Sequence, residues 1–150
     1  MELEAVSCRF GRITALDSIS LSVASGFVFG VVGLNGAGKS TLIDVVTGVV
    51  RPTSGRAHVL GRDVRRDGAT VRALIGVLPH ESALDRELTG TQNLRFAAAL
   101  YGVREPNRRI GEVLDLVGLR ERAGDRVGSL SGGMQRRLAI ARSMLHDPRS

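Results

Sequence analysis

The pattern of hydrophobic and polar positions divides the chain into a strand-rich first part and a helical second part. Apolar residues alternate with polar ones over 19–23, after a turn at 11–12, which predicts a hairpin with one buried face. The run 27–32 is continuously apolar, which is typical of a central strand covered on both faces of a sheet. A short strand over 57–60 and a second apolar run over 71–78 complete the predicted sheet, with at least one more buried strand.

Hydrophobic residues recur at helical spacing in four other segments, namely 42–46, 94–101, 110–117 and 132–145. Thr89 is a suitable start cap for the second of these helices, and Gly118 is a suitable stop for the third. The second and third helices form a predicted helical insert.

Length and composition describe an ordinary globular domain. A chain of 150 residues with 43% hydrophobic content can bury one core, so we expect one domain, with or without a small subdomain, and not two full domains. The single cysteine, Cys8, excludes an internal disulfide framework and a cysteine-based metal cluster, which fits a reducing compartment. The start lacks the basic and apolar stretches of a secretory signal, and no apolar run approaches the roughly 20 residues of a membrane span.

The net charge of +6 would allow an anionic partner, but its distribution does not favour nucleic acid. Arginines scatter through the chain, with a modest concentration from Arg51 to Arg72, and the aromatic content is only 3%. Base stacking needs aromatic side chains, so we read the arginines as a solvated face and expect no nucleic acid partner. Lys39 is the one lysine of the chain and therefore needs a specific explanation.

The loop from Gly33 to Ser40 supplies that explanation. It fits the pattern of glycine, four residues, then Gly-Lys-Ser, and it lies between a predicted strand and a predicted helix. Its glycines let the backbone wrap around a phosphate while the helix presents its positive end. Lys39 would reach the β and γ phosphates, Ser40 would offer its hydroxyl to Mg²⁺, and Thr41 would contact the α phosphate. The alternative is a glycine turn that caps a helix and binds nothing.

A second glycine-rich turn opens the last predicted helix at Leu130-Ser131-Gly132-Gly133-Met134-Gln135. Its N–H groups and the Ser131 hydroxyl could hold further phosphate oxygens. Simple capping of the helix by Ser131 is the alternative. The position of this turn, some 90 residues after the phosphate loop and beyond a helical insert, favours a shared ligand.

These motifs resemble the nucleotide-binding domain of the ATP-binding cassette (ABC) family, and the resemblance covers the whole chain. The segment from Leu34 to Thr41 resembles the family's Walker A loop, and Leu130 to Met134 resembles its signature motif in the form found in bacterial multidrug and polysaccharide exporters. The implied fold is α/β: an ABC-type P-loop NTPase core with an N-terminal antiparallel β subdomain and a helical insert.

The resemblance implies a set of nucleotide contacts. Those within one chain would come from Phe10, at the family's adenine-stacking position, and from Gly33, Leu34, Asn35, Gly36, Ala37, Gly38, Lys39, Ser40 and Thr41. Ser131, Gly132 and Gly133 would contact the ATP and Mg²⁺ held by a second copy, in a head-to-tail dimer.

Two positions depart from the family pattern. His80 stands where the family has a glutamine that touches Mg²⁺ or the attacking water, and a solvated loop histidine is the alternative reading. The chain ends at Ser150, where the family continues with the Walker B aspartate and the catalytic glutamate. We therefore expect an N-terminal part of the cassette, without its C-terminal strands, with an exposed apolar edge and without hydrolysis of its own.

The resemblance further implies an ATPase subunit that powers transmembrane permease subunits from the cytoplasmic face of the membrane. We expect residues 1–150 to be a partial nucleotide-binding domain, divided into a β subdomain and phosphate-loop core (1–79), a Q-loop region and helical insert (80–130) and a signature helix (131–150). One alternative is a soluble ABC ATPase without a membrane partner. Another is a non-catalytic fragment that interacts with an intact cassette.

Overall fold

A computed structural model describes residues 1–79 and 83–148 of the chain. It divides into two compact units, Met1–Ile75 and Gly76–Arg149, each with its own hydrophobic core. None of the helices in the described parts has the length and apolar character needed to cross a bilayer. The three-part division expected from the sequence stays a prediction.

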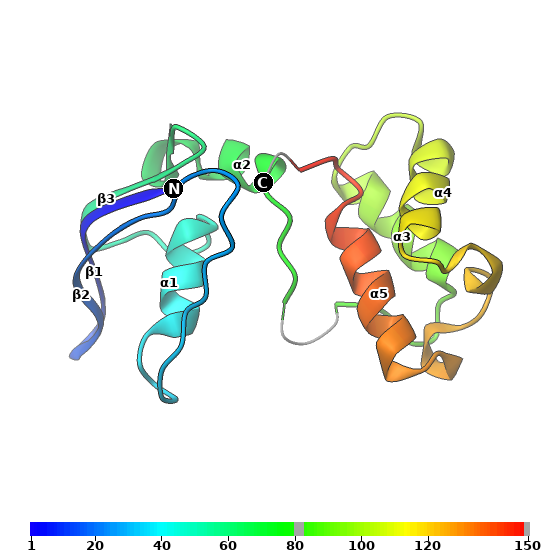
Figure 1. Cartoon of the computed structure of the whole chain (residues 1–150), viewed down its shortest axis with the longest axis horizontal. Coiled ribbons are helices and arrows are strands. Elements are labelled where there is room, and N and C mark those ends of the chain that lie inside the picture. The colour runs from blue at the N-terminus through cyan, green and yellow to red at the C-terminus, as the bar shows by residue number, and fades with distance from the viewer. Residues whose placement is uncertain (80–82, 149–150) are drawn as a thin grey trace. The chain divides into compact units, whose positions relative to one another are not determined.

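The first unit is a small antiparallel sheet that carries two helices (Figure 1). Its strands lie in the order β2-β1-β3-β4, with bounds Ile13–Ser22, Glu2–Phe10, Ser54–Val59 and Arg62–Asp63. The predicted hairpin at residues 11–12 is confirmed, because β1 and β2 pair antiparallel from Phe10 and Ile13 back to Glu2 and Ser22. The short strand expected over 57–60 is confirmed as far as Val59, as the last part of β3, and Leu60 lies in the turn that follows.

Helices α1 (Lys39–Val46) and α2 (Val64–Leu74) pack on the buried face of this sheet. The core between them contains Leu3 and Val6 of β1, Val45 of α1 and Val71 of α2, all 3% exposed or less. Burial of the sheet face and of one stripe on each helix gives this unit a core with no part from the second unit.

The central strand predicted over 27–32 is wrong for this structure. Residues 27–34 form no regular element, and Phe27, Val28 and Val32 are 75%, 103% and 93% exposed. A strand satisfies its backbone N–H and C=O groups only when another strand lies alongside, and no strand in the described residues pairs with this segment. The apolar run has the composition of a buried strand but lacks the neighbours that make one.

The second buried strand expected over 71–78 is also wrong. Residues up to Leu74 belong to α2, and Ile75 is the extended residue that ends this helix. The Asp63 carboxylate accepts hydrogen bonds from the N–H groups of Arg65 and Arg66, and this cap favours a helix over the strand. The helix is kinked at Asp67, and Val64 and Val71, on either side of the kink, are both buried.

The second unit consists of three packed helices, α3 (Gly90–Leu100), α4 (Pro106–Leu116) and α5 (Gly132–Ser143) (Figure 1). Two short 3₁₀ turns, η1 (Arg120–Arg122) and η2 (Val127–Ser129), lie between α4 and α5. The predicted insert is confirmed with its caps: Thr89 begins α3 in a capping box with Gln92, and Gly118 follows α4 at a φ of +63°. Helix α5 ends two residues earlier than expected.

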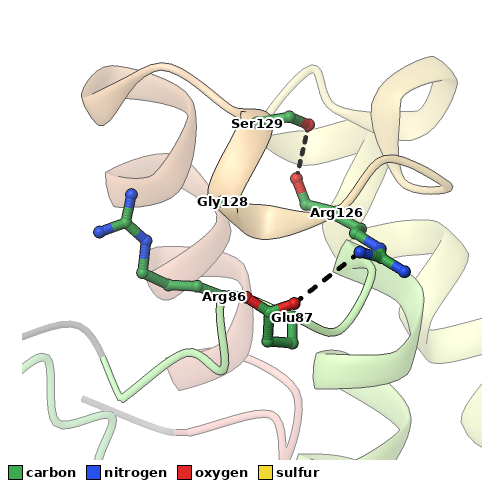
Figure 2. A pocket seen from close by; sticks show the side chains of 5 residues that line it. All are labelled: Arg86, Glu87, Arg126, Gly128 and Ser129. Carbon is green, nitrogen blue, oxygen red and sulfur yellow. Dashed lines mark hydrogen bonds and ion pairs between the residues drawn. The ribbon is translucent and has the colours of Figure 1, made fainter.

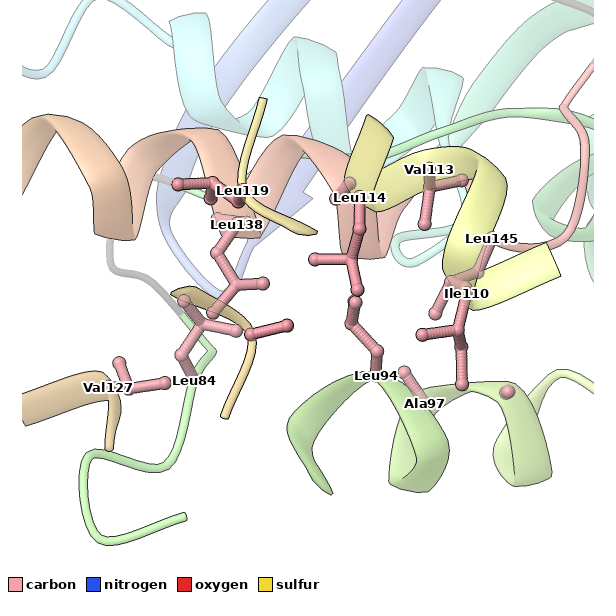
Figure 3. Packing of buried hydrophobic residues seen from close by; sticks show 14 of the residues in the cluster. Leu84, Leu94, Ala97, Ile110, Val113, Leu114, Leu119, Val127, Leu138 and Leu145 are labelled. Atoms are coloured by element: carbon pink, nitrogen blue, oxygen red, sulfur yellow. The ribbon is translucent and has the colours of Figure 1, made fainter. Parts of the chain in front are cut away.

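Figure 3 shows how the three helices meet around leucine and valine side chains. Leu94 of α3, Val113 of α4 and Leu138 of α5 are at most 1% exposed and belong to one cluster. Val127, from η2, is fully buried in the same cluster. This core fixes the N-terminal end of α5, where the second glycine turn lies.

Candidate nucleotide-binding site

The glycine loop of the first unit leads directly into the N-terminus of α1. Gly38 occupies the N-cap position with a φ of +82°, a conformation that L side chains rarely adopt. A Cβ atom there would overlap the carbonyl oxygen of Ala15 and come within 3.0 Å of Leu16 Cδ2. Two constraints therefore require glycine: the left-handed backbone and the close approach of the loop to β2.

The N-terminus of α1 is open for an anion. No side chain among the described residues caps this helix, so its first-turn N–H groups have no side-chain acceptor. Residues 33–37 and Ser40 are all exposed. Uncapped N–H groups and the helix dipole together attract negative charge to this end of α1.

Lys39 folds back over the loop that precedes it. Its Nζ donates hydrogen bonds to the carbonyl oxygens of Gly33 and Leu34, at 2.8 and 2.6 Å. An ammonium group has three donors, so one remains for another oxygen. The loop backbone thus positions the only lysine of the chain against the segment that the sequence assigns to phosphate.

The chemistry of this loop fits a nucleotide phosphate with its metal. Residues 33–41 offer N–H groups, one ammonium group and the hydroxyls of Ser40 and Thr41. Elsewhere in the described residues no group of three or more His, Cys, Asp or Glu side chains could hold a metal ion. The Ser40 hydroxyl and phosphate oxygens would bind a magnesium ion here, and the ion would neutralise part of the phosphate charge.

Phe10 lies at the end of β1, opposite Ile13, and is half exposed. An exposed aromatic ring at a strand end can stack on a base. His80 lies outside the described residues, so its expected role at the metal or water stays a prediction.

The second glycine turn lies in the second unit. Ser131 is the N-cap of α5, and its hydroxyl oxygen accepts a hydrogen bond from the N–H of Met134 at 3.3 Å. Capping, the alternative left open by the sequence, is therefore observed, but the hydroxyl hydrogen remains a donor. Ser131, Gly132 and Gly133 are all exposed, so their polar groups are accessible to a ligand.

Sequence reasoning missed the residue that holds this turn in place. Gln135 is partly buried, and its Nε2 donates to the carbonyl oxygens of Val127 and Leu130, at 3.0 and 2.9 Å. These bonds tie the first turn of α5 to Val127 and Leu130, two buried residues that come before Ser131 in the chain. The only signal in the sequence was a polar residue two positions after Gly133.

A pocket beside the second turn contains two arginines but does not bring them together. Figure 2 shows Arg86 and Arg126 extending away from one another, with Ser129 on the 3₁₀ turn η2. Arg126 faces Glu87, with 3.8 Å between Nη1 and Oε2. A carboxylate within the pocket competes with any anion, so this pocket is a weaker phosphate site than the loop before α1.

The chain is similar to curated bacterial resistance proteins. It is 39% identical to the linearmycin resistance ATP-binding protein LnrL of Bacillus subtilis over 150 residues, covering 99% of this chain and 48% of that protein. It is 44% identical to the daunorubicin resistance ATP-binding protein DrrA3 of Streptomyces coeruleorubidus over 142 residues, covering 93% of this chain and 45% of that protein. The chain thus spans about half the length of these relatives.

The fold is similar to that of solved cassettes. One of them, a dimeric ATP-binding cassette in a post-hydrolysis state bound to ADP and Pi, matches with a TM-score of 0.81 and 25% identity. The match covers 98% of this chain and 70% of that chain. Residues 16–150 match the family model described as ABC transporter, and the chain therefore belongs to the ABC transporter family, among its ATP-binding proteins.

Proposed function

We propose that the chain is the nucleotide-binding part of an exporter's ATP-binding subunit. The loop 33–41 binds ATP with Mg²⁺, and Phe10 stacks on the adenine. The observation that supports this proposal is the geometry at Gly38, a left-handed glycine packed against Ala15 at the N-cap of α1. The N-terminus of this helix has no side-chain cap, and the Lys39 ammonium group is bonded to the loop that precedes it. The match to the family described as ABC transporter supports a transport role over a soluble role without a membrane partner, and removal of a toxic compound would fit the resistance named for the relatives.

Each group of the loop has a separate task in this proposal. The N–H groups of residues 36–41 orient the phosphate oxygens, and the ammonium of Lys39 neutralises charge on the β and γ phosphates. The Ser40 hydroxyl holds the metal and the Thr41 hydroxyl holds the α phosphate. The loop contains no carboxylate to act as base toward water, so we infer that the 150-residue chain alone does not turn ATP over.

The second turn completes the site of another copy. Ser131, Gly132 and Gly133 present a hydroxyl and N–H groups at the exposed N-terminus of α5, and we propose that they contact the γ phosphate of ATP bound to a second nucleotide-binding domain. A dimeric state is named for the similar solved cassette. Closure of such a dimer would drive permease subunits from the cytoplasmic face of the membrane.

Calorimetric titration of the purified chain with Mg-ATP tests the proposed site. The change Lys39→Ala removes the only ammonium group at the loop, and we expect it to weaken binding by at least about tenfold, since charge-assisted contacts of this kind are worth about 1.5–3 kcal/mol. Arg95→Ala, an exposed site on α3 with the same loss of charge, is the matched control and should leave affinity unchanged.

Equal weakening by both variants would mean that net charge, not the loop, attracts the nucleotide. Absence of any heat with Mg-ATP for the unchanged chain would contradict the proposal directly. Phosphate release by the unchanged chain that Lys39→Ala abolishes would contradict only the inference on turnover.

A further inference from the structure

Arginines are used differently in the two units. All ion pairs within the described residues lie in the second unit, where Arg108, Arg109, Arg120, Arg122 and Arg126 contact carboxylates. In the described first unit, from Met1 to Ile75, no arginine forms an ion pair. No carboxylate in contact therefore offsets the charge of these guanidinium groups.

Four of these arginines line one pocket. Arg51, Arg65, Arg66 and Arg72 surround a pocket of ≈ 530 Å³, and its remaining lining residues are glycine, valine and alanine, at positions 48, 49, 64, 68 and 69. No acidic side chain lines it. A concave surface with low-dielectric walls and charge of one sign concentrates its field and attracts counter-ions.

The turn after α1 approaches α2 closely at this pocket. Gly48 follows α1 at a φ of +70°, and a Cβ atom there would come within 3.2 Å of the Gly68 Cα. Arg72 Nη1 donates to the Gly48 carbonyl oxygen at 2.7 Å. One guanidinium is thus fixed at the wall of the pocket before any ligand enters, which lowers the entropy cost of binding.

Asp63, which precedes the α2 residues of the pocket, already caps this helix. The Asp63 carboxylate accepts hydrogen bonds from the N–H groups of Arg65, at 2.7 Å, and Arg66, at 3.3 Å, and the Arg65 bond is the main cause that lowers the pKa of Asp63. It lines a neighbouring pocket with Gly55 and Arg56, and that pocket shares Arg65 and Arg66 with the one lined by four arginines. The N-terminus of α2 is capped by this carboxylate, so anion binding in the arginine pocket must come from side chains.

We propose that this arginine pocket, lined by Arg51, Arg65, Arg66 and Arg72, binds a phosphate monoester. Guanidinium groups bind phosphate oxygens through paired N–H donors, and a monoester carries up to two negative charges and three terminal oxygens. The pocket shares no residue with the loop 33–41, so it is a second anion site beyond the proposed nucleotide site. The phosphate could belong to a soluble metabolite or to the headgroup of phosphatidate.

Titration with glycerol 3-phosphate tests the pocket, because this probe is both a soluble monoester and the water-soluble headgroup of phosphatidate. The titration uses the Lys39→Ala variant, which lacks the main cation of the proposed nucleotide site. The binding measured at the arginine pocket then does not depend on whether the loop 33–41 binds nucleotide. In that background we expect the double change Arg65→Gln and Arg66→Gln to weaken binding at least about tenfold, as expected when charge-assisted hydrogen bonds are lost.

The matched control is Arg9→Gln with Arg62→Gln. Both arginines are exposed, lie in the same unit and line neither this pocket nor the neighbouring one, so net charge falls by the same amount. The control should change affinity less than about twofold, the small effect expected for screened, distant charges. Arg51→Gln, outside any helix, is a second pocket variant whose binding should also weaken.

Vesicles identify the source of the phosphate. Cosedimentation with phosphatidylcholine vesicles containing phosphatidate, lost in the pocket variants and kept in the control, would support the pocket with a lipid headgroup as ligand. Binding of glycerol 3-phosphate without vesicle binding would support it with a soluble ligand.

Three results would overturn the proposal. One is equal weakening by the pocket and control pairs, which indicates diffuse charge. Another is equal retention by phosphatidylserine and phosphatidate vesicles, since the former presents only a phosphodiester. The third is absence of glycerol 3-phosphate binding at millimolar concentration.

Discussion

At the scale of single residues, the glycines of the phosphate loop differ in what they contribute. Gly36 and Gly38 have nearly the same backbone angle, with φ values of +81° and +82°. A Cβ at Gly36 would meet nothing within 4 Å, whereas one at Gly38 would overlap the Ala15 carbonyl oxygen. The two positions therefore separate the cost of the backbone angle from the cost of packing.

Replacement of each glycine by alanine measures these costs by urea unfolding. Gly36→Ala should destabilise the chain by about 1–2 kcal/mol through the left-handed angle alone. Gly38→Ala should cost at least about 1 kcal/mol more, because it also overpacks the contact with β2. Equal losses would show that the loop can move away from Ala15, and the close approach would then not be a requirement.

At the scale of elements, α3 is held by one buried amide in addition to its apolar face. Asn93 is 5% exposed; it accepts a hydrogen bond from the N–H of Asp85 at 2.8 Å and donates to the carbonyl oxygens of Asp85 and Thr89, at 2.9 and 3.1 Å. The amide thus ties the segment before α3 to the first turn of the helix. The periodicity of the sequence places this asparagine on the buried face of the helix, but it does not show which backbone groups the amide binds.

Asn93→Ala should destabilise the second unit by about 2 kcal/mol, since it leaves buried backbone groups without partners. Thermal unfolding followed by circular dichroism measures the loss, with Arg95→Ala as an exposed control on the same helix that should stay within about 0.5 kcal/mol. A loss for Asn93→Ala no larger than that of the control would mean that water replaces the amide.

At the scale of the whole molecule, the apolar segment 27–34 is the most exposed hydrophobic surface in the first unit. Phe27, Val28, Val32 and Leu34 are each at least 75% exposed. Contiguous apolar surface of this kind, with an unpaired backbone of strand-like composition, favours association between chains.

Sedimentation velocity at increasing concentration tests this expectation. The pair Val28→Lys and Val32→Lys should keep the chain monomeric at concentrations where the unchanged chain associates, because it places charge within the segment. Leu116→Lys, at an isolated apolar residue on α4 that is 66% exposed, is the control and should change little. Association that persists in the double variant would mean that chains associate through a surface other than the segment 27–34.

The sequence by itself determined the features that depend on neighbouring residues. The hairpin turn, the caps at Thr89, Gly118 and Ser131, and the glycine loop before α1 all follow from local backbone and side-chain chemistry, which acts within a few residues of the chain. The same local chemistry was enough to predict the family, because its motifs are short and have fixed internal spacing.

Only the tertiary structure decided the features that depend on distant partners. The run 27–32 has strand composition, but a strand forms only beside another strand, and periodicity does not report whether one is present. The contact of Gly38 with Ala15 and the gathering of Arg51 with Arg65, Arg66 and Arg72 likewise join residues far apart in the chain. Their arrangement comes from packing of helices on a sheet, which no local pattern contains.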